Sequence, residues 1–204
     1  MTTLAQTHDA LLLDLDGTVY LGGQPIDHVA PALARATTFP VAETTAGRVR
    51  GYEDRGVRIF KGVPYGASTA SASRFLPPQK PQSWTGVRDA FEFGGRPPQI
   101  VGGEPEEMLS TDPREAQSED CLVLNVWTPK TGSGRRPVMV WFHGGGFASG
   151  SGSYTIYSGH ELARKHDVVA ISVNHRLNIF GYLYLAHFGG KWATASNVGM
   201  LDNV

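Results

Sequence analysis

The chain has 204 residues, of which 41% are hydrophobic and 18% charged, enough for one or two globular domains with a buried core. Its net charge of −1 gives no electrostatic reason to expect nucleic acid or an anionic membrane surface as a partner. Residues 1–17 contain no lysine or arginine, and every apolar run is short. We therefore expect neither a secretory signal nor a membrane span.

The first predicted strand begins at Ala10 and ends in two alternating carboxylates, Asp14 and Asp16. Because strand side chains alternate between faces, the two aspartates are expected on the same face. Asp27 is a suitable N-cap for a helix predicted over residues 27–36.

Residues 10–36 resemble the start of a haloacid-dehalogenase-like phosphatase of the nitrophenylphosphatase type. The resemblance implies that Asp14 attacks phosphorus, that Asp16 is the acid/base, and that magnesium is shared between them. The family also needs a later strand that ends in paired acids. The pair Glu119-Asp120 follows the polar residues 116–118, which do not form such a strand. We interpret the two aspartates as remnants on a short appendage, with phosphomonoester phosphatase activity as the alternative.

The composition changes near residues 37–40, and alternating apolar residues follow over 41–49 and 57–63. The intervening residues 51–56 are polar and begin and end in glycine. This pattern predicts a hairpin whose polar tip is 51–56.

A further predicted strand, Val138–Phe142, leads directly into His143 and three glycines. Glycine lets backbone N–H groups approach a bound oxyanion closely, and lipases and esterases of the α/β-hydrolase fold use this motif as part of an oxyanion hole. Such enzymes carry their nucleophile in Gly-x-Ser-x-Gly, which does not occur in the 204 residues. The nearest match, residues 66–70, lacks the second glycine.

The segments from about residue 40 to 204 resemble, in order and spacing, the N-terminal part of a type-B carboxylesterase, the family of cholinesterases and bacterial nitrobenzyl esterases. The motifs that carry the resemblance are Phe60–Gly66, Ser73–Pro78, Trp84–Ala90, Ser118–Trp127, His143–Phe147, Asn174–Leu177 and Asn197–Asn203. The resemblance implies hydrolysis of a small uncharged carboxylic ester through a serine acyl-enzyme, without a cofactor or metal. It assigns the oxyanion donors to Gly145 and Gly146, and structural roles to His143 and His175.

The same resemblance implies two ion pairs, Arg74 with Glu119 and Arg176 with Asp202. The alternative is that these are solvated surface charges that contribute little. Relatives often join the position of Cys121 to a second cysteine, but this chain has only one. We expect a buried free thiol and a cytoplasmic, reducing compartment.

The predicted fold class is α/β: the N-terminal part of an α/β-hydrolase sheet, incomplete, with a short unrelated strand–helix appendage. We divide the chain into a phosphatase-like segment over 1–38 and a carboxylesterase part over 39–204. The nucleophile, acid and histidine of the triad are not expected within it, so a non-catalytic fusion product is a further alternative. In the resembled fold Val138–Phe142 lies between the 168–173 strand and the strand that carries the nucleophile. We therefore expect Val138–Phe142 to be an exposed sheet edge.

Overall fold

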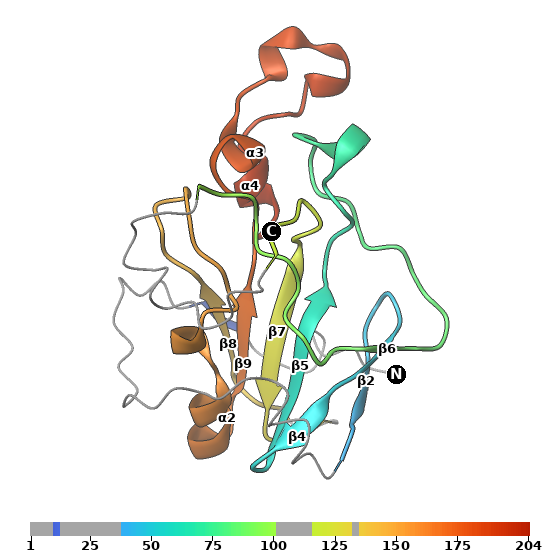
Figure 1. Ribbon diagram of the computed structural model, residues 1–204, viewed down its shortest axis with the longest axis vertical. Coiled ribbons are helices and arrows are strands. Elements are labelled where there is room, and N and C mark those ends of the chain that lie inside the picture. Colours follow the sequence, from blue (N-terminus) through green and yellow to red (C-terminus); the bar gives the residue numbers. More distant parts are fainter. Residues whose placement is uncertain (1–9, 13–37, 101–115, 132–134) are drawn as a thin grey trace.

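The computed structural model describes residues 10–12, 38–100, 116–131 and 135–204 (Figure 1). Its main sheet has six strands in the order β1-β8-β9-β7-β5-β4, and a smaller sheet has the order β2-β3-β6. The strands of the main sheet are β1 (Ala10–Leu12), β4 (Tyr52–Asp54), β5 (Val57–Pro64), β7 (Val123–Thr128), β8 (Val138–Phe142) and β9 (Val169–Val173). Those of the smaller sheet are β2 (Val41–Glu43), β3 (Arg48–Arg50) and β6 (Val87–Asp89).

The helical elements are short. They are α2 (His160–His166), α3 (Asn178–Tyr182) and α4 (Val198–Leu201), with the 3-10 turns η2 (Ser71–Ser73), η4 (Thr155–Tyr157), η5 (Ala186–Phe188) and η6 (Gly190–Trp192). Within the described part of the chain, no helix is long and apolar enough to cross a bilayer.

Strand direction brings the ends of β8 and β9 together. β8 pairs in parallel with β9, whereas β7 pairs antiparallel with both β9 and β5. Parallel strands end at the same edge of a sheet. Gly144, Gly145 and Gly146, here called the glycine segment, follow β8, and His175-Arg176 follows β9. The two segments therefore leave the sheet side by side.

The main sheet has an apolar core on each face. On one face, α2 covers a cluster of Tyr52, Val57, Ile59, Trp127, Ala163 and Ala170. On the other face, β2 and β3 of the smaller sheet cover a cluster that includes Phe60, Val63, Val126, Val138 and Val169. Neighbouring residues of one strand, such as Val126 and Trp127 on β7, enter opposite cores, as strand alternation requires.

The predicted hairpin was placed wrongly. Residues 41–50 form a hairpin of their own, β2–β3, which Thr44 closes by donating from Oγ1 to the Gly47 carbonyl at 2.8 Å. Residues 52–54, expected at a polar tip, are the strand β4, paired with β5. The turn between them is only Arg55-Gly56, and both residues have positive φ, of 48° and 79°. Positive φ at both residues of a two-residue turn matches the twist of the strands that it joins. The turn is therefore shorter than the polar sequence suggested.

The prediction that β8 is a sheet edge was also wrong. β1 pairs with β8 in parallel, with Ala10 opposite Val138 and Leu12 opposite Val140 (Figure 1). Residues 10–12 therefore supply the outer strand of the main sheet. Asp14, Asp16 and the predicted helix over 27–36 lie outside the described residues.

Candidate functional site

The glycine segment turns sharply as it leaves β8. Gly145 and Gly146 have φ of +111° and +59°, which glycine adopts at little cost. A methyl group on Gly145 would lie 2.1 Å from the Ser149 carbonyl oxygen, so a larger residue there would displace the backbone. These two positions therefore require glycine for this path of the chain.

The turn directs its polar backbone groups in two ways. The carbonyl of Gly145 points back into the loop, where it accepts hydrogen bonds from the N–H groups of Ala148 and Ser149 at 3.0 and 3.1 Å. Among the residues that the structure describes, the N–H groups of Gly145 and Gly146 have no hydrogen-bond acceptor. Two adjacent unpaired N–H groups on an accessible loop can bind an anionic oxygen.

His143 supports this loop from beneath. Its imidazole is buried, and its Nδ1 lies 2.8 Å from the Gly144 carbonyl oxygen, so Nδ1 carries the proton and donates it. The ring stacks on that of His175, with centroids 4.8 Å apart and planes 10° from parallel. Burial and the neighbouring His175 lower the pKa of His143 to about 4. The residue is therefore neutral at neutral pH and positions the loop, as expected from the sequence.

Gln99 fixes the other end of the loop. Its side-chain amide accepts from the N–H of Gly150 at 2.8 Å and donates to the Gly150 carbonyl at 2.9 Å. Gly150 lies against the His143 ring, and a methyl group there would lie 2.3 Å from Nδ1. Gln99 and the His143 ring thus hold the end of the loop at Gly150 between them. Gln99 could not be recognised from the sequence, because a glutamine after two prolines carries no recognisable signal.

Phe147 links the loop to α3. Its carbonyl accepts from the N–H of Asn178 at 2.7 Å, and its ring lies 5.1 Å from that of Tyr182. It has a positive φ of 61°, which is uncommon for a residue with a side chain. Strain of this kind is typical of functional loops. No pattern in the sequence indicated it.

A buried polar network joins Gly152, which follows the loop, to the main sheet. Ser172 donates to the Gly152 carbonyl at 2.6 Å, and the Gly152 N–H donates to the side chain of Asn174 at 2.7 Å. Asn125 donates to Ser172 at 3.1 Å. The hydroxyl of Tyr65 donates to the Asn174 carbonyl at 2.5 Å. These bonds anchor the segment to β7 and β9.

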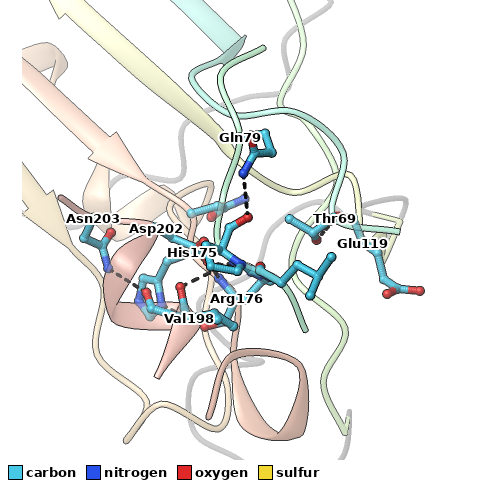
Figure 2. Close-up of polar contacts among 12 residues, drawn as sticks. Thr69, Gln79, Glu119, His175, Arg176, Val198, Asp202 and Asn203 are labelled. Atoms are coloured by element: carbon cyan, nitrogen blue, oxygen red, sulfur yellow. Dashed lines mark hydrogen bonds and ion pairs between the residues drawn. The ribbon is translucent and has the colours of Figure 1, made fainter. Parts of the chain in front are cut away.

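The structure confirms the predicted pair of Arg176 and Asp202, shown in Figure 2. Arg176 donates from Nη2 to Oδ1 at 2.6 Å and from Nε to Oδ2 at 2.9 Å, and both side chains are almost fully buried. Its Nη1 also donates to the Leu76 carbonyl at 2.7 Å. The pair therefore ties the segment after β9 to α4 and to the loop that contains Leu76.

The second predicted pair, Arg74 with Glu119, is also confirmed. Arg74 binds both carboxylate oxygens, with Nε 2.6 Å from Oε2 and Nη2 in contact with Oε1. The arginine side chain remains 44% exposed. Thr69 donates to the carbonyl of the same Glu119, as Figure 2 shows. This pair closes a surface loop, whereas the Arg176 pair lies inside the molecule.

Cys121 is a buried free thiol, as expected. Burial, followed by the charge of Asp202, raises its pKa to about 12. A thiol in this state is a poor nucleophile. Among the described residues there is also no group of three or more His, Cys, Asp or Glu side chains that could hold a metal ion.

Residues 38–204 match the carboxylesterase family. The chain is 40% identical over 165 residues to the para-nitrobenzyl esterase of Bacillus subtilis, which covers 81% of this chain and 33% of that protein. It is 44% identical over 146 residues to the phenmedipham hydrolase of Pseudarthrobacter oxydans, covering 72% of this chain and 30% of that one.

Solved structures agree with the sequence matches. A para-nitrobenzyl esterase structure superposes with a TM-score of 0.74 at 37% identity, covering 81% of this chain and 33% of that one. A Geobacillus stearothermophilus carboxylesterase gives a TM-score of 0.69 at 42% identity, covering 79% of this chain and 32% of that one. This chain therefore spans about a third of the length of its relatives. The family match begins at residue 38, after the segment that resembles a phosphatase. On the match over residues 38–204, the chain belongs to the carboxylesterase family.

Proposed function

We propose that this chain supplies the oxyanion-stabilising part of a carboxylic ester hydrolase site. The observation that carries the proposal is the pair of accessible, unpaired N–H groups of Gly145 and Gly146 on a loop held from beneath by His143. During ester hydrolysis the carbonyl oxygen gains negative charge as the tetrahedral intermediate forms. Donors that are already oriented stabilise that charge without reorganisation.

The nucleophile of this reaction is a serine on a Gly-x-Ser-x-Gly turn in the type-B carboxylesterases that the sequence resembles. Because the 204 residues contain no such turn, the attacking serine and its base must come from outside them. We therefore expect the isolated chain to give no burst with p-nitrophenyl acetate and no covalent labelling by a serine-directed phosphonate. Stoichiometric labelling of any serine in this chain would contradict the assignment.

The proposal is tested in a chimera. Residues 38–204 replace the matched third of the Bacillus subtilis para-nitrobenzyl esterase, and hydrolysis of p-nitrophenyl acetate is measured. Gly146→Ala is expected to lower kcat by about 10²–10³-fold, since the strained turn no longer presents its N–H group to the oxyanion. Gly56→Ala is the matched control, because Gly56 also has positive φ and open space around its Cα but lies in the β4–β5 turn. Equal kcat values for the two variants would overturn the proposal.

The substrate that the proposal implies is a small uncharged carboxylic ester, with no cofactor. A cytoplasmic location fits the same picture, since Cys121 has no second cysteine with which to form an internal disulfide. Neither nucleic acid nor a membrane is part of the proposed function.

Phosphomonoester phosphatase activity through Asp14 and Asp16 is the alternative that the sequence left open. Both aspartates lie outside the described residues, and the family match begins only at residue 38. Magnesium-dependent hydrolysis of p-nitrophenyl phosphate that is lost in Asp14→Asn would favour this alternative.

A further inference from the structure

The two N–H donors of the glycine segment belong to peptide groups whose carbonyl ends are already bound. A peptide group is planar and trans, so its C=O and its N–H point in opposite directions. The Gly144 carbonyl binds the Nδ1 of His143, so the Gly145 N–H in the same peptide group points away from that ring. The direction of each donor therefore depends on what binds the carbonyl oxygen behind it.

The N–H of Gly146 is oriented through a longer chain of contacts. It shares a peptide group with the Gly145 carbonyl, which accepts from the N–H groups of Ala148 and Ser149 at 3.0 and 3.1 Å. The Ala148 N–H in turn shares a peptide group with the Phe147 carbonyl. A residue that holds the Phe147 carbonyl therefore also sets the direction of the Gly146 N–H, through two peptide groups and one hydrogen bond.

Asn178, the first residue of α3, holds that carbonyl. Its backbone N–H donates to the Phe147 carbonyl at 2.7 Å, and its side-chain Nδ2 donates to the Pro98 carbonyl at 2.7 Å. Its φ is +45°, in the left-handed region that asparagine enters more readily than most residues with a side chain. The left-handed backbone and the side-chain bond together fix the direction in which the Asn178 N–H points.

The Pro98 carbonyl is a firm anchor for Asn178, because its neighbours are themselves held. Pro97 is fully buried, and the proline ring fixes φ at both Pro97 and Pro98. The backbone N–H of Gln99 donates to the side chain of Gln117 at 2.7 Å. The side chain of Asn178 is therefore bound to a rigid part of the fold.

We propose that Asn178 is a positioning residue for ester hydrolysis, because it orients the Gly146 N–H toward the oxyanion through the Phe147 carbonyl. This inference rests on the proposed function and assigns a residue to it. His143 acts on the Gly145 N–H in the corresponding way, so each donor is set by a different residue. A displacement of about 1 Å in a reacting geometry can lower a rate about 10²-fold.

The kinetic test uses the chimera described above with p-nitrophenyl acetate. Asn178→Asp keeps the size of the side chain but replaces the Nδ2 donor with an oxygen that repels the Pro98 carbonyl. We expect kcat to fall by about 10–10²-fold and KM to change by less than about twofold, because the oxyanion forms only after the substrate has bound. The inhibition constant of a trifluoromethyl ketone, whose adduct with the nucleophilic serine carries the same oxyanion, should rise by a similar factor.

Asn197→Asp is the matched control. Asn197 also precedes a short helix, α4, with a left-handed φ of +53°, but it is exposed and its side chain makes no capping hydrogen bond. Its substitution should leave kcat, KM and the inhibition constant unchanged. Circular dichroism checks that both variants are folded.

Hydrogen exchange of the Ala148 amide, followed by NMR on the 204-residue chain, tests the same coupling without activity. We expect Asn178→Asp to speed this exchange by at least about tenfold, because the Phe147 carbonyl is held less firmly and the loop opens more often. The amide of Gly51, which donates to the Pro40 carbonyl far from this loop, should exchange as in the wild type. Asn197→Asp should change neither amide.

Gly146→Ala in the same chimera separates this inference from the proposed function. If Gly146→Ala lowers kcat but Asn178→Asp does not, Asn178 is not a positioning residue and the proposed function stands. If Gly146→Ala leaves kcat unchanged, the proposed function is wrong and this inference falls with it, even where the Ala148 amide responds. Equal Ala148 exchange in Asn178→Asp and Asn197→Asp, or a loss of activity through KM alone, would also overturn the inference.

Discussion

The imidazole of His143 is buried beside a second imidazole, so protonating it costs folding free energy. The unfolded chain takes up this proton at the ordinary pKa of 6.5, and the folded chain only near 4. Between these values the unfolded state binds more protons, so the free energy of unfolding falls as the pH falls. The full decrease in the free energy of unfolding from His143 is about 3 kcal/mol. Burial lowers the pKa of His175 as well, so His175 adds to this decrease.

Urea unfolding between pH 7.5 and 4.5 measures this loss. His143→Gln should flatten the pH dependence, because the substituted side chain does not titrate. His187→Gln is the matched control, since His187 is exposed, and it should leave the pH dependence unchanged. Identical pH profiles for wild type and His143→Gln would show that His143 is not the group responsible.

The two arginine pairs differ in burial and should differ in their contribution to stability. Removing one partner of a buried pair leaves an uncompensated charge, so Asp202→Asn is expected to lower the free energy of unfolding by about 3–5 kcal/mol. Glu119→Gln disrupts a pair whose arginine is 44% exposed, and about 1 kcal/mol or less is expected. Urea titration of both variants gives the comparison. Equal losses would mean that burial does not set the contribution of these pairs.

Among the elements, α2 packs closely on the main sheet through Ala163. Ala163 is fully buried in the cluster that contains Trp127 and Ala170. Ala163→Leu is expected to destabilise the fold by about 1–3 kcal/mol through overpacking. Arg164→Leu, one position along the same helix, puts the same side chain into solvent and should cost about 0.5 kcal/mol or less. Thermal unfolding followed by circular dichroism distinguishes the two, and a similar melting temperature would contradict this packing.

The elements differ in how well the sequence predicted them. β8 follows from an uninterrupted apolar run and β9 from an apolar run that only Ser172 interrupts, and the glycine segment follows from its composition. The β2–β3 hairpin was missed because Thr44 closes its turn through a side-chain hydrogen bond within an alternating apolar pattern. The two ion pairs came from the family resemblance. Gln99 and the positive φ of Phe147 could not be predicted, because both depend on contacts with residues far away in the sequence.

At the scale of the whole molecule, the place of β1 was the least predictable feature. Three residues that lie before the carboxylesterase match pair with the strand that precedes the glycine segment. Nothing local in the sequence specifies that pairing, because any exposed strand edge can accept a strand through its backbone groups. The strands of the carboxylesterase part alone leave β8 at the edge of the sheet, because β1 lies before that part of the chain.

The pairing of β1 should protect the chain from self-association. β8 reads Val-Met-Val-Trp-Phe, an apolar strand without charge or internal proline, which is the composition of an aggregation-prone edge. Leu11→Pro removes a backbone N–H from β1 and cannot pair normally with β8, whereas Leu11→Val keeps that N–H. We expect Leu11→Pro to shift the purified chain toward larger species in size-exclusion chromatography, and Leu11→Val to elute like wild type. The opposite edge strand, β4, is expected to contribute little, because Glu53 and Asp54 place charges on it. If Leu11→Pro elutes as wild type does, β1 does not protect the edge of β8 in solution.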